Sequence, residues 1–233
     1  MIQRHIMRAK TFLNQSVTRV LEGGGPSRTV NLVGDQPRTD NQVRQSEPGW
    51  LIFMRETWRN PRAMGTGWAS SPQLARAIAN QVPSSPEQGL IVELGGGTGV
   101  VTEALLQKGI APEYLISVEQ SASLADYLHK RYPAIRVIKG DALHLSDLLG
   151  NDYQRVNTIV SGLPFRSLPR AVGHDIIKQI EKLLLPKKGL FVQFTYDLTG
   201  RGFFLPHHFK HVSHKIVWGN LPPARIDTYR LDG

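Results

Sequence analysis

The sequence predicts one α/β domain built on a seven-stranded, mostly parallel sheet with helices on both faces. From residue 90 to residue 196, short apolar runs alternate with amphipathic segments, which is the pattern of a parallel sheet with crossover helices. The last two apolar runs follow each other with no helix between them, so they are expected to close the sheet as an antiparallel hairpin. A length of 233 residues and a hydrophobic content of 40% suit one domain with a packed core.

Each strand is predicted from a short apolar run bounded by turn residues. The seven runs are Leu90–Leu94, Tyr114–Glu119, Ile135–Lys139, Val156–Val160, Leu190–Tyr196, His211–Trp218 and Arg225–Leu231. Between the first five runs, apolar residues recur every three or four positions, which is the periodicity of a helix. These helices are expected at Thr98–Lys108, Ala122–Arg131, Leu143–Leu149 and Val172–Leu185.

The N-terminal part has a different character from the rest of the chain. Residues 1–48 are predicted to form a basic amphipathic helix and a flexible leader, and residues 49–233 the folded domain. The first 21 residues contain no acid and repeat apolar side chains at helical spacing, as membrane-surface helices do. A helix packed on the domain or an organelle-targeting peptide fits the same pattern. Within the domain, helices are also expected at Trp50–Arg59 and from Ser71 to about Val82.

The composition narrows the classes of partner and chemistry. Lys and Arg number 28 against 19 Asp and Glu, a net charge of +9. This balance indicates a polyanionic partner, either nucleic acid or an anionic membrane surface. The absence of cysteine excludes disulfides, thiolate metal sites and a cysteine nucleophile. No apolar run is long enough to span a bilayer, and the first residues lack the apolar stretch of a secretory signal.

Three acidic residues stand at the first three strand ends, next to a Gly-rich turn. The run from Glu93 to Gly99 (ELGGGTG) leads from strand to helix, where glycines let the backbone approach a ligand closely. A carboxylate at Glu119 can accept both ribose hydroxyls of a nucleoside. Asp141 ends the third strand and can receive the exocyclic amine of an adenine. This set suits a cationic adenosyl ligand, and a doubly wound fold with helix-capping acids is the alternative.

These motifs resemble the class I S-adenosylmethionine-dependent methyltransferases over roughly residues 68–231. The resemblance implies a Rossmann-like fold and S-adenosyl-L-methionine as the cofactor. It also implies that the Gly-rich turn and the ends of the second, third and fourth strands contact this cofactor. The residues concerned are Glu93, Gly95, Gly97, Thr98, Gly99, Glu119, Gln120, Asp141, Ala142 and Ser161.

The end of the fourth strand, residues 161–165 (SGLPF), bears on the methyl acceptor. Methyltransferases that act on adenine or amide nitrogen usually carry Asn-Pro-Pro-Tyr or Asn-Leu-Pro-Tyr here, and Gly162 removes the Asn oxygen. The departure argues against the rRNA adenine dimethylases. Together with Gln193–Tyr196 and Asn220–Ala224, the segment resembles the bacterial phospholipid N-methyltransferases. That resemblance implies phosphatidylethanolamine as the substrate, methylated towards phosphatidylcholine.

The expected reaction is a direct displacement in which a neutral amine attacks the sulfonium methyl group. Carbonyls and aromatic faces near the sulfur and nitrogen would stabilise the moving charge. The catalytic candidates at strand ends are Tyr196, Ser161 and Phe165. The substrate-binding candidates are Gly162, Leu163, Pro164, Arg201 and Lys210, where Gly162 leaves room for a growing quaternary head group. No metal is expected, because the histidines at 207, 208, 211 and 214 have no carboxylate near them in sequence.

The first hypothesis is therefore a phospholipid N-methyltransferase, cytoplasmic and peripherally associated with the inner face of the membrane, with no nucleic acid as partner. The stretch between Asp197 and Asp227 contains no acid and interleaves basic with aromatic residues, which suits a lipid surface carrying phosphates. An RNA adenine N-methyltransferase, or a methyltransferase for another amino-lipid such as an ornithine lipid, is the alternative. A non-catalytic adenosyl- or membrane-binding protein is a third.

Overall fold

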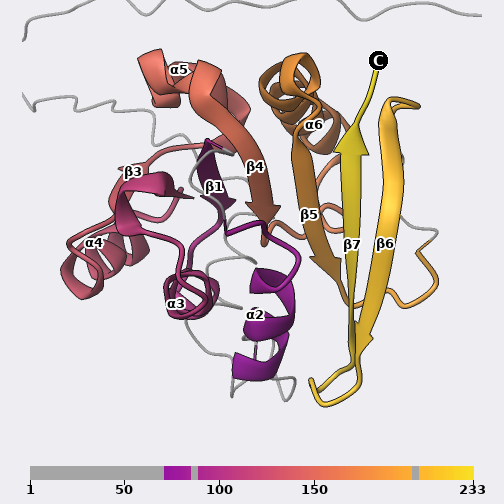
Figure 1. Ribbon diagram of the computed structural model, residues 1–233, viewed down its shortest axis with the longest axis horizontal. Helices are drawn as coiled ribbons and strands as arrows, with labels where there is room; N and C mark the ends of the chain where they lie inside the picture. Colours follow the sequence, from indigo (N-terminus) through magenta and orange to yellow (C-terminus); the bar gives the residue numbers. More distant parts are fainter. Residues whose placement is uncertain (1–70, 85–88, 201–204) are drawn as a thin grey trace, which may run out of the picture. The chain divides into compact units, whose positions relative to one another are not determined.

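A seven-stranded sheet runs through the computed structural model, which describes residues 71–84, 89–200 and 205–233. The strand order is β3-β2-β1-β4-β5-β7-β6 (Figure 1). The strands are β1 (Leu90–Leu94), β2 (Leu115–Glu119), β3 (Arg136–Lys139), β4 (Val156–Ser161), β5 (Leu190–Thr195), β6 (Phe209–Val217) and β7 (Ala224–Leu231). The first five are parallel, and β7 runs antiparallel to both β5 and β6. The predicted fold class is confirmed.

The helices of the described residues are α2 (Pro72–Ala79), α3 (Val100–Gln107), α4 (Ala122–Arg131), α5 (Leu145–Leu149) and α6 (Arg170–Leu184). α2 begins where predicted, because the Ser71 hydroxyl accepts the Leu74 N–H at 3.1 Å and proline occupies the first turn. α3 begins later than predicted, since Gly99 at its N-cap has a φ of 82°, in the left-handed region. α5 is shorter than predicted, because a 3-10 turn at Ala142–His144 precedes it.

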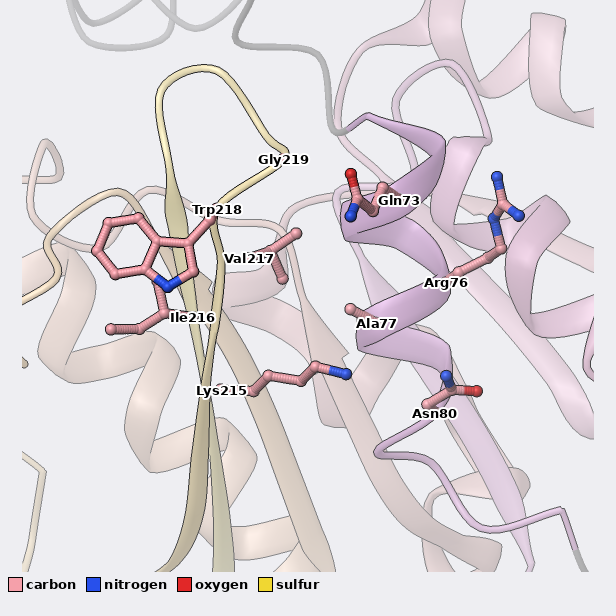
Figure 2. A pocket seen from close by; sticks show the side chains of 9 residues that line it. All are labelled: Gln73, Arg76, Ala77, Asn80, Lys215, Ile216, Val217, Trp218 and Gly219. Atoms are coloured by element: carbon pink, nitrogen blue, oxygen red, sulfur yellow. The ribbon is translucent and has the colours of Figure 1, made fainter.

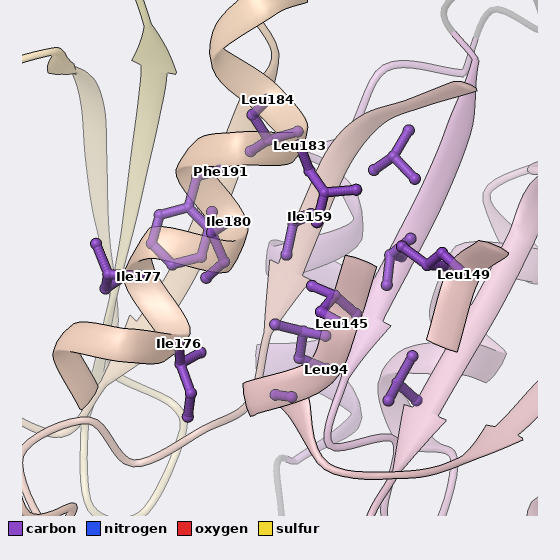
Figure 3. Packing of buried hydrophobic residues seen from close by; sticks show 14 of the residues in the cluster. Leu94, Leu145, Leu149, Ile159, Ile176, Ile177, Ile180, Leu183, Leu184 and Phe191 are labelled. Carbon is purple, nitrogen blue, oxygen red and sulfur yellow. The ribbon is translucent and has the colours of Figure 1, made fainter. Parts of the chain in front are cut away.

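Two hydrophobic clusters hold the helices against the sheet. α5 and α6 cover one face, and α2 and α3 contribute to the cluster on the other. Figure 3 shows Ile180 and Leu183 of α6 on the side of the sheet where Ile159 and Phe191 lie. Because both faces are covered, every residue of β1 and β2 is buried. This explains why both strands read as continuous apolar runs rather than alternating ones.

The carboxyl ends of the parallel strands and the β6–β7 turn lie at one edge of the sheet, called here the carboxyl edge. Figure 1 shows β4 and β5 pointing to the end where that turn lies. The register across this edge runs through Leu94↔Ser161, Ser161↔Gln193, Thr195↔Arg225 and Val217↔Ala224. Residues 218–223 therefore extend from the same edge as the Gly-rich turn. Any ligand bound at the strand ends is positioned by this edge.

Several predicted features lie outside the described residues. They are the leader at 1–48, the helix expected at Trp50–Arg59 and the substrate-binding candidate Arg201. No helix within the described ranges is long and apolar enough to cross a membrane.

Candidate active site

Glu119 at the end of β2 holds the Gly-rich turn that follows β1. Its Oε2 accepts the Gly97 N–H at 3.0 Å, and its Oε1 accepts the Ser121 N–H at 2.8 Å. Gly95 and Gly97 have φ values of 76° and 56°, which side chains rarely tolerate. Burial raises the pKa of Glu119 above its usual value, and the hydrogen bonds from these backbone donors offset only part of that rise. Since a carboxylate offers about four acceptor positions, Glu119 retains acceptor capacity for ribose hydroxyls.

Glu93 lies beneath the Gly-rich turn. It is 2% exposed, and its Oε2 accepts the Thr102 hydroxyl at 2.5 Å and the Ser117 hydroxyl at 2.9 Å. A Cβ on Gly96 would stand 2.1 Å from Ser117 Oγ and 3.4 Å from Glu93 Oε2. Burial raises the pKa of Glu93. Glu93 therefore supports the turn, and its direct contact with the cofactor stays a prediction. Gly96 is a close-approach residue outside the predicted set.

Gln120 and Asp141 connect the ends of β2 and β3. Gln120 Nε2 donates to Asp141 Oδ2 at 2.8 Å, and Asp141 Oδ1 accepts the Leu143 N–H at 2.9 Å. Asp141 thus caps the 3-10 turn before α5, as the capping alternative expected. Thr98 and Gln120 are exposed beside the Gly-rich turn, while Ala142 is buried. Adenine recognition by Asp141 stays a prediction, compatible with this capping bond because the carboxylate has further acceptor capacity.

The acceptor segment, residues 161–165, packs against the Gly-rich turn. The Gly162 N–H donates to Leu94 O at 2.9 Å. A Cβ on Gly162 would stand 3.3 Å from Gly95 O and 3.4 Å from Leu94 O. The backbone of the Gly-rich turn therefore borders the space beside Gly162, and room for a head group there stays a prediction. Gly162 joins the acceptor segment to the cofactor side of the site.

The carbonyl oxygens of Leu163 and Pro164 and the hydroxyl of Ser161 already accept hydrogen bonds within the protein. Leu163 O accepts the Phe165 N–H and Gln193 Nε2, each at 3.0 Å, and Pro164 O accepts N–H groups of the next turn. The Ser161 hydroxyl is fully buried and accepts the Leu163 N–H at 3.2 Å. The two carbonyl oxygens therefore stabilise the fold of this segment.

The structure places the catalytic candidate Phe165 in the hydrophobic core. Its ring belongs to the core cluster under α6 and meets the Phe191 ring edge-on, with centroids 6.5 Å apart. The residue is only 7% exposed. An aromatic face at the carboxyl edge comes instead from Tyr196, whose ring meets Phe194 edge-on at 6.1 Å.

Gln193, near the end of β5, has an unpartnered amide oxygen. Its Nε2 donates to Leu163 O at 3.0 Å and to Phe194 O at 2.6 Å. Two carbonyl partners for the NH₂ group fix which way the amide points. Its Oε1 is buried and has no hydrogen-bond partner among the described residues. Gln193 is not among the site residues predicted individually from the sequence, although a polar residue inside the apolar strand β5 is a signal that could have identified it.

Asn220 fixes the β6–β7 turn to the rest of the carboxyl edge. It is 2% exposed, its Oδ1 accepts the Ser71 N–H at 3.1 Å, and its Nδ2 donates to Pro222 O at 2.7 Å. Its side chain also hydrogen-bonds to the phenol of Tyr196, whose pKa is raised by burial. Asn220 thus ties together the start of α2, the hairpin turn and the end of β5, a role that sequence spacing alone does not reveal.

The structure places the substrate-binding candidate Lys210 away from the carboxyl edge. Lys210 pairs with Arg230, which pairs in turn with Leu190 at the start of β5. Because β6 runs towards the carboxyl edge, its first residues lie at the opposite edge of the sheet. Lys215, near the end of β6, is an exposed lysine that lies towards the carboxyl edge.

Two of the four tail histidines, His208 and His211, have carboxylate partners from other elements of the chain. His208 Nε2 lies 2.9 Å from Glu181 Oε1, and His211 Nε2 lies 2.9 Å from Asp227 Oδ1. Asp227 also receives two N–H groups of the Arg225 guanidinium. A search of the described residues found no group of three His, Asp or Glu able to hold a metal.

Comparisons with known proteins place these features among methyltransferases. No family model matches the chain. It is 27% identical to the ornithine lipid N-methyltransferase of Singulisphaera acidiphila over 179 residues, 75% of this chain and 92% of that protein. It is 30% identical to ribosomal RNA small subunit methyltransferase A of a Synechococcus strain, over 36% of this chain and 31% of that protein.

The fold is also similar to that of solved methyltransferase structures, of which we describe one. It is the magnesium protoporphyrin IX methyltransferase of Synechocystis PCC 6803 with bound S-adenosylmethionine, at a TM-score of 0.57 and 11% identity. The likeness covers 80% of this chain and 99% of that one.

Proposed function

We propose that this chain, an S-adenosylmethionine-dependent methyltransferase, methylates the amine of a membrane amino-lipid, with an ornithine lipid as the preferred acceptor. The observation that carries the proposal is the match to an ornithine lipid N-methyltransferase along 92% of that protein's length. The match to the ribosomal RNA enzyme covers 31% of its length. Phosphatidylethanolamine, the first expectation from the sequence, becomes the second acceptor of the same class.

The carboxyl edge suits S-adenosylmethionine as the cofactor. Gly95 and Gly97 form a cradle with positive φ values, and Glu119 has acceptor capacity for ribose hydroxyls. Asp141 and Gln120 would stand at the adenine end, with Glu93 supporting the turn from below. When bound, the cofactor supplies an electrophilic methyl group on a sulfonium.

The chain's first task is to present the acceptor amine in its neutral form. A primary amine of the lysine type has a pKa near 10.4, so deprotonation at pH 7 costs about 4–5 kcal/mol. Partly buried apolar surroundings lower this cost, since they disfavour the ammonium ion. Leu163, Phe194 and Tyr196 are partly buried residues of this kind at the carboxyl edge.

Tyr196 and Gln193 then orient the amine. Burial raises the pKa of Tyr196, so its phenol is neutral at pH 7, and Asn220 fixes its position. The unpartnered Oε1 of Gln193 supplies an amide oxygen in place of the one that Gly162 lacks, and it accepts an N–H of the amine. Holding donor and acceptor in line is the larger source of rate, up to about 7–11 kcal/mol in favourable cases.

The test offers labelled S-adenosylmethionine to the full chain with three substrates in parallel. These are vesicles containing an ornithine lipid, vesicles containing phosphatidylethanolamine, and total RNA. Label in the ornithine lipid at the highest initial rate is the expected result. Label in phosphatidylethanolamine alone keeps the amino-lipid class and overturns the preferred acceptor. Label in RNA alone overturns the proposal and favours the reading that the Synechococcus match supports.

A further inference from the structure

We propose that the β6–β7 turn and the adjoining groove between α2 and β6 form a docking surface for an anionic lipid bilayer. Trp218 and Leu221 enter the headgroup region, and the groove receives lipid phosphate. The inference rests on the proposed lipid substrate and names the surface that brings the carboxyl edge to it.

Two large apolar side chains project from the β6–β7 turn. Trp218 is 70% exposed and Leu221 is 83% exposed. Asn220, between them, is buried and anchored to Ser71 and Pro222, so the turn is fixed while its apolar neighbours face outward. Trp is favoured at membrane–water interfaces because its ring is apolar and its N–H is polar, and Leu221 adds a second exposed apolar side chain on the same turn.

A groove of about 620 Å³ opens beside this turn. It is lined by Gln73, Arg76, Ala77 and Asn80 of the α2 region and by Lys215, Ile216, Val217, Trp218 and Gly219 of the β6 end. Figure 2 shows Lys215 reaching from β6 towards α2 near Asn80, with Trp218 on the other side of β6. Gln73 fills the space at Gly219, where a Cβ would stand 2.1 Å from its Oε1. Ammonium, guanidinium and amide groups are the donors that bind phosphate.

The charges around the groove favour an anion. Among the described residues, neither Arg76 nor Lys215 makes an ion pair. The sequence has no Asp or Glu at positions 71–86, which include α2, or at positions 198–226, which include β6. Cations without nearby acids are attracted to the negative potential of an anionic bilayer. The combination with Trp218 and Leu221 favours a lipid surface over RNA, because headgroup insertion uses apolar and cationic groups together.

The β6–β7 turn lies at the edge of the sheet where the proposed reaction takes place. Residues 218–223 leave the sheet at the same edge as the acceptor segment. A bilayer that touches the turn therefore lies at the edge where the acceptor amine is methylated. Docking elsewhere, for example on Lys210 at the far edge, would hold the site away from the lipid.

The test uses the absence of cysteine from the chain. Single cysteines are introduced in the full chain as Trp218→Cys, Leu221→Cys and, as the control, Val212→Cys on β6, which is also exposed, at 57%. Each carries an environment-sensitive fluorophore and is mixed with phosphatidylglycerol vesicles that contain no substrate. We expect enhanced emission and quenching by spin-labelled lipid at 218 and 221, and a much smaller response at 212. Equal responses at all three positions, or none at 218 and 221, would overturn the proposal.

Charge and turnover variants separate this inference from the substrate proposal. Arg76→Gln with Lys215→Gln is expected to weaken vesicle binding about tenfold at low salt, and less at high salt. Lys210→Gln with Lys178→Gln removes the same charge elsewhere and should bind as the parent does. Trp218→Gln with Leu221→Gln should lower turnover of vesicle lipid and preserve turnover of a short-chain, dispersed amino-lipid. If this double variant turned over vesicle lipid as fast as the parent, the docking proposal alone would be overturned. If the parent docked on vesicles but methylated no lipid, the substrate proposal alone would be overturned.

Discussion

The carboxylate of Glu119 accepts a hydrogen bond from the backbone N–H of Gly97 at 3.0 Å, across 22 residues of sequence. The same carboxylate accepts the Ser121 N–H with its other oxygen. One side chain therefore sets the shape of the Gly-rich turn. Since the same carboxylate is our candidate for the cofactor ribose, we expect cofactor binding and the shape of this turn to be coupled at Glu119.

Glu119→Gln should weaken binding of S-adenosylmethionine by about 1–3 kcal/mol, which is roughly fivefold to over a hundredfold in Kd. An amide has one acceptor oxygen, so it cannot receive both backbone donors and the ribose. Titration calorimetry on the folded variant measures the change. Glu113→Gln, an exposed acid before β2, is the control, and equal affinity in both variants would remove Glu119 from the site.

Gly162→Asn should reduce both cofactor affinity and turnover. The added Cβ would press on Gly95 O and Leu94 O at 3.3 and 3.4 Å, and overpacking of this kind costs about 1–3 kcal/mol. Gly162→Ala carries the same Cβ without the amide and separates crowding from hydrogen bonding. The Kd for the cofactor and kcat for the lipid are measured on both. Loss of lipid turnover with unchanged cofactor affinity would show that Gly162 borders the acceptor alone.

Gln193→Met should lower kcat for the lipid about fivefold to over a hundredfold, at roughly 1–3 kcal/mol for a lost buried hydrogen bond. Methionine keeps the length of the side chain and removes the amide. The bond that Gln193 donates to Leu163 O is lost as well, so thermal unfolding is followed in parallel. A variant that keeps its cofactor affinity and its kcat would exclude Gln193 from the acceptor site.

Glu93→Gln should alter how stability depends on pH. Burial raises the pKa of Glu93, so the native state binds its proton more tightly than the unfolded state, and stability from this group declines as pH rises from about 4.5 through the raised pKa. Glutamine can still accept the Thr102 and Ser117 hydroxyls on one oxygen, as Glu93 does.

Denaturant unfolding at several pH values between 4 and 8 checks this. The unfolding free energy of Glu93→Gln relative to the parent should increase with pH, with Glu113→Gln as the control for loss of a carboxylate. A difference that stays constant over the range would contradict the assignment.

The order and type of the elements in the described ranges could be predicted because they depend on local patterns. β1 and β2 read as apolar runs because both of their faces are buried, and α2 starts at its Ser-Pro cap. Element ends were less accurate where a backbone conformation decided them, as at Gly99 with its positive φ.

The contents of the site were harder to predict because they depend on register and on contacts between distant residues. Lys210 belongs to the basic, aromatic stretch after Asp197, but its pairing with Arg230 places it at the edge of the sheet opposite the carboxyl edge. Glu93 matched a motif, yet its partners Thr102 and Ser117 show that it points beneath the turn. Nothing local in the sequence tells that Asn220 meets Ser71 across 149 residues.

The most direct test of the amino-lipid proposal is tandem mass spectrometry of the lipids after one reaction. Vesicles containing equal amounts of an ornithine lipid and phosphatidylethanolamine are incubated with the full chain and S-adenosylmethionine. The account predicts ornithine lipid carrying one or more added methyl groups, which fragmentation places on the head-group amine nitrogen. Both lipids recovered unmethylated, while RNA in a matched reaction gains methyl groups on adenine, would contradict it.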